Sequence, residues 1–378
     1  MVAESDIERV TSGLSNAESR WARFGPYYAM FPVDFAFNVV KRYTRPGDAV
    51  LDPFAGRFTS IFAASALGRY GVGIEINPVG WLYGRVKLAP APLKKVLDRL
   101  YDVDCCKTAF RKDIEMLPDF FRLCFCDSVL MFLLSAKKHL NWRRSGPDAT
   151  LMAHILIYLH GKRNMALSNQ MRMTKAMSPD YSVRWWKAKG FNEPPEIDTY
   201  AFLKQRIEWR YKKGMPDLLK SKTLLGDCTK ELSRMKMMPE VSSFNLLFTS
   251  PPYAGVVNYY TDQWLRMWML GGTDRPVSST EPHLKRFADL DMYRLLLEKT
   301  FTDAAQRMAP DGTVFVRTDA RPYTFETTKD VLRSVFPNHS MEILPAPYLK
   351  KTQTSLFGDP GEKPGEMDII LSSKQSLY

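Results

Sequence analysis

Short apolar runs rich in β-branched residues recur along this chain, and turn residues and a helix-like pattern follow most of them. Runs that alternate with helical patterns in this way predict the strands of a mostly parallel sheet with helices packed against it. We therefore predict an α/β fold. The predicted strands are residues 49–54, 70–76, 222–227, 244–249 and 313–318, and residues 341–344 and 368–371 complete the sheet.

One interval interrupts this alternation. Residues 90–215 contain long helix-like patterns rich in Lys, Arg, Met and Trp and no run of the strand type. We interpret this interval as a mainly helical inserted domain that divides the α/β domain into residues 1–89 and 216–378. Most of the net charge of +12 lies in the insertion, because residues 91–215 hold 23 Lys and Arg against 13 Asp and Glu. Such a surface fits nucleic acid, acidic protein or lipid.

The cysteines and the apolar segments bound the cellular environment. The five cysteines (Cys105, Cys106, Cys124, Cys126 and Cys228) contain no second pair at zinc-ligand spacing, so we expect no metal site and free thiols in a reducing cytoplasm. The N-terminus is polar and acidic, and the longest apolar segment, residues 120–140, is interrupted by Arg122 and Asp127. We therefore expect neither a signal peptide nor a membrane span.

Two predicted strands end in an acidic residue, at the place where α/β sheets bind nucleosides. Asp52 is followed by a turn with Gly56, and Thr59 or Ser60 could cap the next helix. Glu75 ends the second strand, where a carboxylate accepts hydrogen bonds from ribose hydroxyls. Spaced glycines for a diphosphate are absent, which argues against a dinucleotide. Either acid alone could be a turn-former, but together they indicate a nucleoside-containing cofactor.

The strand at residues 244–249 runs directly into Thr249-Ser250-Pro251-Pro252-Tyr253. Two prolines remove two backbone donors and hold an extended turn, so carbonyl oxygens and Ser250 can face a ligand. An exocyclic amino group of a base is a poor nucleophile, and acceptors around its N–H groups would direct its lone pair at a methyl donor. Tyr253 could stack on a base taken out of the duplex. Packing at the end of a buried strand is the simpler alternative.

At this point the sequence resembles the DNA amino-methyltransferases, which make N4-methylcytosine or N6-methyladenine. The resemblance lies in separate blocks and leaves out most of residues 90–215. The blocks are Gly25-Pro26-Tyr27-Tyr28-Ala29-Met30-Phe31-Pro32, Asp52-Pro53-Phe54-Ala55-Gly56, Gly73-Ile74-Glu75-Ile76-Asn77-Pro78, Leu225-Gly226-Asp227-Cys228, the Ser-Pro-Pro-Tyr turn, and Pro347-Tyr348-Leu349-Lys350-Lys351-Thr352-Gln353-Thr354. Phe58 stands where the family usually has a second glycine.

The resemblance implies a Rossmann-like, seven-stranded methyltransferase sheet with one reversed strand, and S-adenosylmethionine as cofactor. The implied cofactor contacts are Tyr28, Met30, Asp52, Pro53, Phe54, Ala55, Gly56, Glu75, Ile76, Asn77, Asp227, Cys228 and Thr249. The implied catalytic residues are Ser250, Pro251, Pro252 and Tyr253. Serine at the first position of the tetrapeptide, after Thr249, favours N4 of cytosine over N6 of adenine. Double-stranded DNA is the expected partner, and a partner restriction endonuclease is a further prediction.

The insertion is our candidate for target recognition. It places cations beside aromatic residues, a combination that binds phosphates and base edges, at Arg143, Arg144, Arg184, Trp185, Trp186 and Lys187. A hydrophobic core with a solvated charged face would give the same pattern. The same ambiguity applies to Trp264, Met267 and Trp268, which fit a base pocket or a core-facing stripe. An RNA amino-methyltransferase and a non-catalytic DNA-binding regulator are the competing functions.

Overall fold

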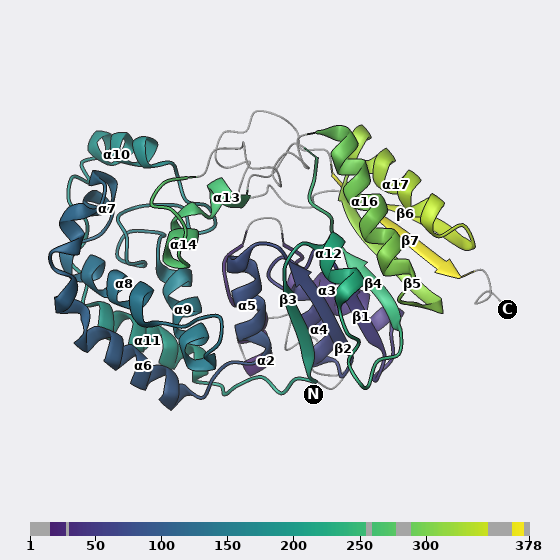
Figure 1. Ribbon diagram of the computed structural model, residues 1–378, viewed down its shortest axis with the longest axis horizontal. Coiled ribbons are helices and arrows are strands. Elements are labelled where there is room, and N and C mark those ends of the chain that lie inside the picture. The colour runs from purple at the N-terminus through teal and green to yellow at the C-terminus, as the bar shows by residue number, and fades with distance from the viewer. Residues whose placement is uncertain (1–15, 28–29, 255–258, 277–288, 347–364, 374–378) are drawn as a thin grey trace.

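A seven-stranded sheet forms the centre of the α/β part of the protein (Figure 1). The computed structural model describes residues 16–27, 30–254, 259–276, 289–346 and 365–373. The described strands follow the order β3-β2-β1-β4-β5-β7-β6. Among the described strands β7 alone runs opposite to the others, which confirms the predicted sheet with one reversed strand. The strands are β1 (Ala49–Asp52), β2 (Tyr70–Glu75), β3 (Ser221–Leu225), β4 (Phe244–Thr249), β5 (Met308–Asp319), β6 (His339–Ala346) and β7 (Glu366–Ser373).

Successive strand residues point to opposite faces of the sheet, and the two hydrophobic cores follow this alternation. Val50, Leu246 and Phe248 belong to one core, and Leu51 and Leu247 belong to the other. The first core is covered by α3 (Val33–Tyr43), α4 (Thr59–Ala66) and α5 (Pro78–Leu88), and the second by α12 (Cys228–Arg234), α16 (Leu290–Ala305) and α17 (Pro322–Val335). Strands buried on both faces are continuous apolar runs, which explains why the sequence revealed them.

The chain between α5 and β3 is helical and contains no strand. Its elements are α6 (Leu93–Cys105), the 3-10 helices η2 (Lys107–Phe110) and η3 (Asp113–Met116), α7 (Asp119–Cys124), α8 (Asp127–His139), α9 (Gly146–Tyr158), α10 (Pro179–Ala188) and α11 (Thr199–Tyr211). In Figure 1 these helices lie on one side of α5 and the sheet on the other. We call them the helical segment.

The helical segment shares a hydrophobic core with the α/β part. Trp186 of α10 and Phe121 of α7 belong to the same core as Phe62 of α4. Three further helices lie outside the helical segment in the sequence: α2 (Ala17–Ala22), α13 (Tyr259–Asp262) and α14 (Trp264–Met269). Because this core is continuous, the helical segment is packed directly onto the sheet-covering helices. No helix in the described part of the chain is long and apolar enough to cross a membrane.

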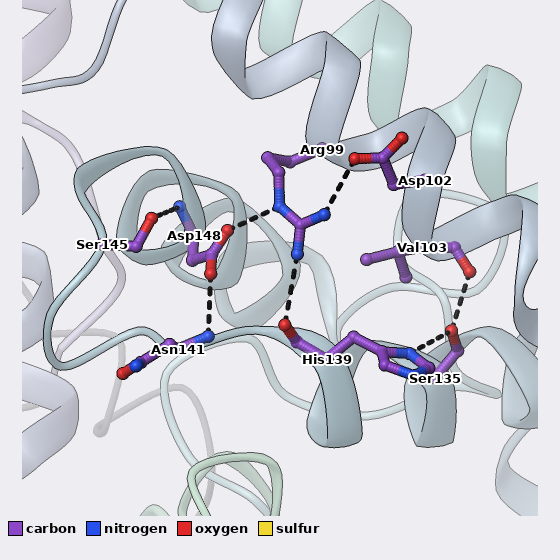
Figure 2. Close-up of polar contacts among 8 residues, drawn as sticks. All are labelled: Arg99, Asp102, Val103, Ser135, His139, Asn141, Ser145 and Asp148. Atoms are coloured by element: carbon purple, nitrogen blue, oxygen red, sulfur yellow. Dashed lines mark hydrogen bonds and ion pairs between the residues drawn. The ribbon is translucent and has the colours of Figure 1, made fainter.

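A polar cluster around Arg99 joins three helices inside the helical segment (Figure 2). Arg99 of α6 donates to Asp148 of α9 (Nε to Oδ1, 2.7 Å), to Asp102 (2.8 Å) and to the His139 carbonyl at the end of α8 (3.1 Å). The second oxygen of Asp148 accepts the Asn141 amide (2.9 Å). The loop between α8 and α9 is therefore held in place by the helices on both sides.

Candidate active site

The carboxyl ends of β1, β2 and β4 lie side by side at the centre of the sheet. β1 pairs in parallel with both β2 and β4, so the strand order reverses direction at β1. Open α/β sheets bind ligands at such a switch point, outside the carboxyl ends of the strands. Asp52, Glu75 and Thr249 end these three strands. The sheet thus brings together the predicted cofactor residues and the proline turn.

Asp52 joins the loop after β1 to the turn after β4. Its buried carboxylate accepts hydrogen bonds from the Thr249 hydroxyl (2.6 Å), the Phe54 amide (3.1 Å) and the Ser60 hydroxyl. Burial raises the pKa of Asp52 to about 6, and these hydrogen bonds oppose the rise. If Asp52 were replaced by an apolar residue, these three donors would lose their acceptor. Asp52 is therefore central to the shape of this site.

The first turn of α4 departs from our prediction. The Ser60 hydroxyl donates to Asp52, and the Thr59 hydroxyl accepts from Arg57 (Nε to Oγ1, 3.2 Å). Neither side chain caps α4, so the predicted cap is wrong. Arg57 also donates to the Gly25 carbonyl (3.0 Å). This contact attaches the segment before α3 to the loop after β1.

Phe58 occupies the position where the amino-methyltransferases usually have a second glycine. Its φ of 62° and ψ of 40° lie in the left-handed region that glycine favours. The ring is fully buried. A Cβ added to Gly73 or to Gly84 would lie 2.5 Å or 2.1 Å from a ring atom of Phe58. Phe58 therefore keeps a glycine-like backbone, and two glycines of β2 and α5 leave room for its side chain.

Glu75 is buried and binds the loop after β1. Its carboxylate oxygens accept the backbone amides of Gly56 (2.8 Å) and Asn77 (2.7 Å). Burial raises the pKa of Glu75 to about 8. The Asn77 side chain caps α5 by accepting the Val79 amide (2.9 Å). Nδ2 of Asn77 is buried and has no hydrogen-bond partner among the described residues.

We expect the free energy of unfolding of the ligand-free protein to fall as pH rises from the ordinary glutamate pKa of 4.5 to about 8. Within this window the folded chain holds the Glu75 proton and the unfolded chain has released it, so the folded state binds more protons and loses stability with rising pH. Asp52 acts in the same direction between 3.8 and about 6. Urea unfolding at a series of pH values measures this slope.

Glu75→Gln should reduce the slope between pH 6 and 8, because the variant has no proton to lose there. The matched control is Glu342→Gln, at an exposed position on β6. Its profile should run parallel to that of the wild type. A wild-type stability that rises over this window, or an unchanged slope in Glu75→Gln, would contradict the expectation.

The turn after β3 lies beside the end of β2. The Gly226 amide donates to the Glu75 carbonyl (3.0 Å), and Asp227 caps α12 by accepting the amide and the hydroxyl of the residue two positions later. Cys228 is buried, with its thiol 3.4 Å from the Thr300 hydroxyl of α16. The Cys228 side chain therefore lies in the core between two helices, so the predicted contact of this residue with the cofactor stays a prediction for its backbone alone.

The remaining predicted cofactor residues differ in exposure. Ile76 and Met30 are exposed to 37% and 39%. Tyr28 lies outside the described residues, but its neighbour Tyr27 is buried and lies near Gly56. Along the loop after β1 the residues are buried or half-buried: Pro53, Phe54 and Ala55. Site blocks far apart in sequence therefore meet around the end of β1.

The proline turn is held at both ends. At its start, Thr249 is fully buried and bonded to Asp52. At its end, the Tyr253 hydroxyl donates to Oε1 of Glu366 on β7 (3.1 Å). Between these anchors lie a buried Pro251 and the half-buried Ser250 and Pro252. The late block at residues 347–354, predicted to join this site, lies outside the described residues.

Comparisons with known proteins match blocks of this site. Residues 6–79 match the DNA methylase family. The type II methyltransferase M.MjaII of Methanocaldococcus jannaschii is 26% identical over 127 residues, which are 33% of this chain and 24% of that protein. The DNA adenine methyltransferase YhdJ of Escherichia coli is 52% identical over 40 residues, which are 11% of this chain and 14% of that protein. The predicted resemblance to the DNA amino-methyltransferases is confirmed.

This chain thus spans about a quarter or less of the length of these two relatives. Among solved structures, TrmN of Thermus thermophilus aligns with a TM-score of 0.36 and 11% sequence identity, over 94% of this chain and 52% of that one. The amino-methyltransferase family implies S-adenosylmethionine as methyl donor.

The site residues fit S-adenosylmethionine. The Glu75 oxygens accept the Gly56 and Asn77 amides, and a carboxylate has further lone pairs that can accept ribose hydroxyls. The unpartnered Nδ2 of Asn77 is a buried donor that a nucleoside acceptor would satisfy. Exposed Ile76 provides an apolar surface at the end of β2 for a base. S-adenosylmethionine would therefore be held by residues at the ends of β1 and β2.

The aromatic residues after the proline turn belong to the hydrophobic core that the helical segment shares with the α/β part. Trp264 and Trp268 are buried, and Met267 packs against the same core. The Trp264 indole donates to the Met177 carbonyl (3.0 Å) in the helical segment. These three residues therefore form a core-facing stripe.

The predicted DNA contacts divide into surface and core residues. Trp186 is 1% exposed, its indole donates to the Gln170 carbonyl (2.6 Å), and its ring stacks on Phe120. The predicted DNA contact of Trp186 is wrong, because the side chain is in the core. Trp185 is half-buried, and the cations are exposed: Arg143, Arg144, Arg184 and Lys187.

Sequence reasoning missed a buried charged cluster beside the proline turn. Arg317 of β5 donates to both oxygens of Asp368 on β7 (2.6 and 2.7 Å) and lies 3.3 Å from Glu366. The sequence signal for this cluster was one charged residue within each of two apolar runs, Arg317 and Asp368. The pairing itself was not readable, because the two strands are far apart in sequence.

Proposed function

We propose that this chain is a DNA methyltransferase that transfers a methyl group from S-adenosylmethionine to an exocyclic amino group of a base taken out of the duplex. The observation that carries the proposal is the 2.6 Å hydrogen bond between Thr249 and Asp52. It joins the proline turn to the loop after β1, so that acceptors for an amino group stand beside a nucleoside site at the switch point of the sheet.

The chemistry follows from the groups that the turn presents. S-adenosylmethionine, when bound, supplies an electrophilic methyl group on sulfur. Prolines at 251 and 252 cannot donate hydrogen bonds, so the turn offers carbonyl oxygens and the Ser250 hydroxyl. Acceptors at both N–H groups of an exocyclic amine favour a pyramidal nitrogen with its lone pair directed away from the ring. Tyr253 provides an aromatic face for the extruded base.

We favour cytosine N4 as the acceptor, and adenine N6 is the alternative. Serine at the first position of the tetrapeptide, preceded by threonine, supports cytosine. The relative named as a DNA adenine methyltransferase supports adenine. Duplex DNA free of base methylation should be incubated with the protein and labelled cofactor, digested to nucleosides and separated. Label in N4-methylcytosine supports our assignment, and label in N6-methyladenine replaces it with the alternative.

The same assay separates the competing functions. Structured RNA is offered in parallel with duplex DNA. Transfer to RNA alone would identify an RNA methyltransferase, and DNA binding without any transfer would favour a regulator that retains the fold. A partner restriction endonuclease and a location in the cytoplasm stay predictions.

We further propose that α10 contacts DNA near the extruded base. The segment directly before α10 is bonded to the segment that follows the proline turn: the Ala176 amide donates to the Asp262 carbonyl (2.8 Å), and the Gln263 amide side chain donates to the Thr174 carbonyl (3.0 Å). Lys175 forms an ion pair with Asp262 (2.6 Å). These contacts tie the start of α10 to the active-site side of the chain, at the upper edge of Figure 1.

The loop that carries the other exposed cations, Arg143 and Arg144, is bonded to α5. Arg85 near the end of α5 donates to the carbonyls of Trp142 (2.9 Å) and Arg143 (2.7 Å). It lies eight residues beyond Asn77, roughly 12 Å along the helix axis from the cofactor residues. The loop with Arg143 and Arg144 is therefore farther from the ends of the strands, and we rank α10 first as the DNA contact.

Replacing both Arg184 and Lys187 by Ala should weaken binding to duplex DNA roughly tenfold at moderate salt and lower the slope of log affinity against log salt by about 2. Each cation that neutralises a phosphate releases condensed counterions, so its loss changes the salt dependence as well as the affinity. Fluorescence anisotropy with labelled duplex at several salt concentrations measures both.

The matched control replaces Lys94 and Lys95 by Ala. Both are exposed and belong to α6, the helix at the lower edge of Figure 1, and their loss changes the net charge by the same amount. The control should keep the wild-type salt slope. Equal slopes for the two double variants would mean that α10 makes no special phosphate contacts.

A further inference from the structure

One cation and two carboxylates form a cluster between the end of β5, the start of β7 and the proline turn. We call Arg317, Glu366 and Asp368, together with Phe35 of α3, the Arg317 cluster. Arg317 and Asp368 are buried, at 9% and 7% exposure, and Glu366 is half-buried. The Arg317 guanidinium carbon also lies 3.6 Å from the centre of the Phe35 ring.

The antiparallel pairing of β5 and β7 places these side chains together. Arg317 stands opposite Asp368, and Asp319 stands opposite Glu366. Residues two apart on a strand share a face, so Glu366 and Asp368 both lie on the face where Arg317 is. This register therefore gives one cation two carboxylates.

The two carboxylates have different contacts. Both oxygens of Asp368 are bonded to Arg317, in the two-pronged geometry that arginine and carboxylate favour. Glu366 faces Arg317 with Oε2 only (3.3 Å) and accepts the Tyr253 hydroxyl at Oε1 (3.1 Å). Burial raises the pKa of Glu366, and Arg317 opposes the rise. Asp368 thus holds the arginine, and the arginine holds Glu366 towards the turn.

We propose that Glu366 is a positioning residue, which holds the Tyr253 hydroxyl so that the ring is fixed where the extruded base must stack. The proposal rests on the proposed function, because Tyr253 is the residue given to the base there. A tyrosine side chain swings about its Cα–Cβ bond, and a hydrogen bond at the hydroxyl limits that motion. Fixing the ring before the base arrives lowers the entropic cost of reaching the reactive geometry.

Glu366→Ala should lower kcat about tenfold and leave the Kd for S-adenosylmethionine within about twofold, since the cofactor residues are on other strands. Glu366→Gln keeps an acceptor at Oε1 and should stay within about threefold of the wild-type kcat. The measurement is transfer of labelled methyl to methylation-free duplex DNA over a range of DNA concentrations. Thermal unfolding of each variant is followed alongside.

Tyr253→Phe removes the other half of the contact. It should lower kcat about as much as Glu366→Ala, and the double variant should be no worse than either single variant. Multiplying losses in the double variant, or an unchanged kcat in Glu366→Ala, would overturn the proposal. The matched control is Glu342→Ala, an exposed glutamate of β6, which should keep wild-type kinetics.

A measurement without catalysis tests the contact itself. In protein labelled with 3-fluorotyrosine, the 19F resonance missing from Tyr253→Phe belongs to Tyr253. This resonance should shift in Glu366→Ala and stay in place in Glu342→Ala. An unmoved resonance would overturn the positioning role even if the protein transfers methyl groups. If the resonance shifts in Glu366→Ala but the wild type transfers no methyl group, the proposed function would be overturned and, with it, the catalytic purpose of the contact.

Discussion

Gly84→Ala is expected to destabilise the protein by about 3 kcal/mol, because the added methyl group would overpack the core. In a helix with free space this substitution would stabilise by about 0.5–1 kcal/mol, since alanine is the better helix former. Here a Cβ at position 84 would lie 2.1 Å from the Phe58 ring. Denaturant unfolding gives the free energy directly. The loop after β1 should shift with Phe58, so cofactor affinity should fall as well.

The matched control is Gly146→Ala, at the start of α9, where a Cβ would meet nothing within 4 Å. This variant should be neutral or slightly more stable. Phe58→Gly combined with Gly84→Ala should be less destabilised than the two single changes added together, because removing the ring makes room for the methyl group. Additive losses would show that Phe58 and Gly84 are not coupled through their contact.

Ser250→Ala is expected to lower kcat for methyl transfer roughly 100-fold while the Kd for S-adenosylmethionine stays close to that of the wild type. Groups that are preorganised around a reacting centre have effects of this size when one is deleted. Ser250 is half-buried and lies between the two anchors of the turn, so its loss leaves Thr249 and Tyr253 in place. Single-turnover transfer and calorimetric titration of the cofactor separate the two quantities.

The matched control is Ser233→Ala, an exposed serine on α12 whose hydroxyl binds a carbonyl of its own helix. Its turnover should be unchanged. If Ser250→Ala loses cofactor affinity and turnover to the same extent, the serine supports the cofactor site and is not an acceptor for the amino group.

Much of the sheet was readable from the sequence, because its strands are short apolar runs bounded by turns. The prediction for 244–249 coincides with β4, whereas 313–318 covers only part of β5 (Met308–Asp319). β5 begins with Met308-Ala309-Pro310-Asp311-Gly312, which has no apolar alternation, and its register against β4 is irregular near Phe244. The short predictions for β6 and β7 have the same cause, since strand ends are defined by pairing and not by composition.

Local chemistry determined which residue types stand at the site, and tertiary contacts decided what each one does. Asp52, Glu75 and the proline turn were visible because an acid or a pair of prolines at the end of a strand is a local pattern. The roles of Phe58, Trp186 and Cys228 were not visible, because a buried ring or thiol has the same local sequence as an exposed one. The links between Asp52 and Thr249 and between Tyr253 and Glu366 join positions 197 and 113 residues apart. Such contacts exist only once strand order and register are set, and these depend on packing of the whole sheet.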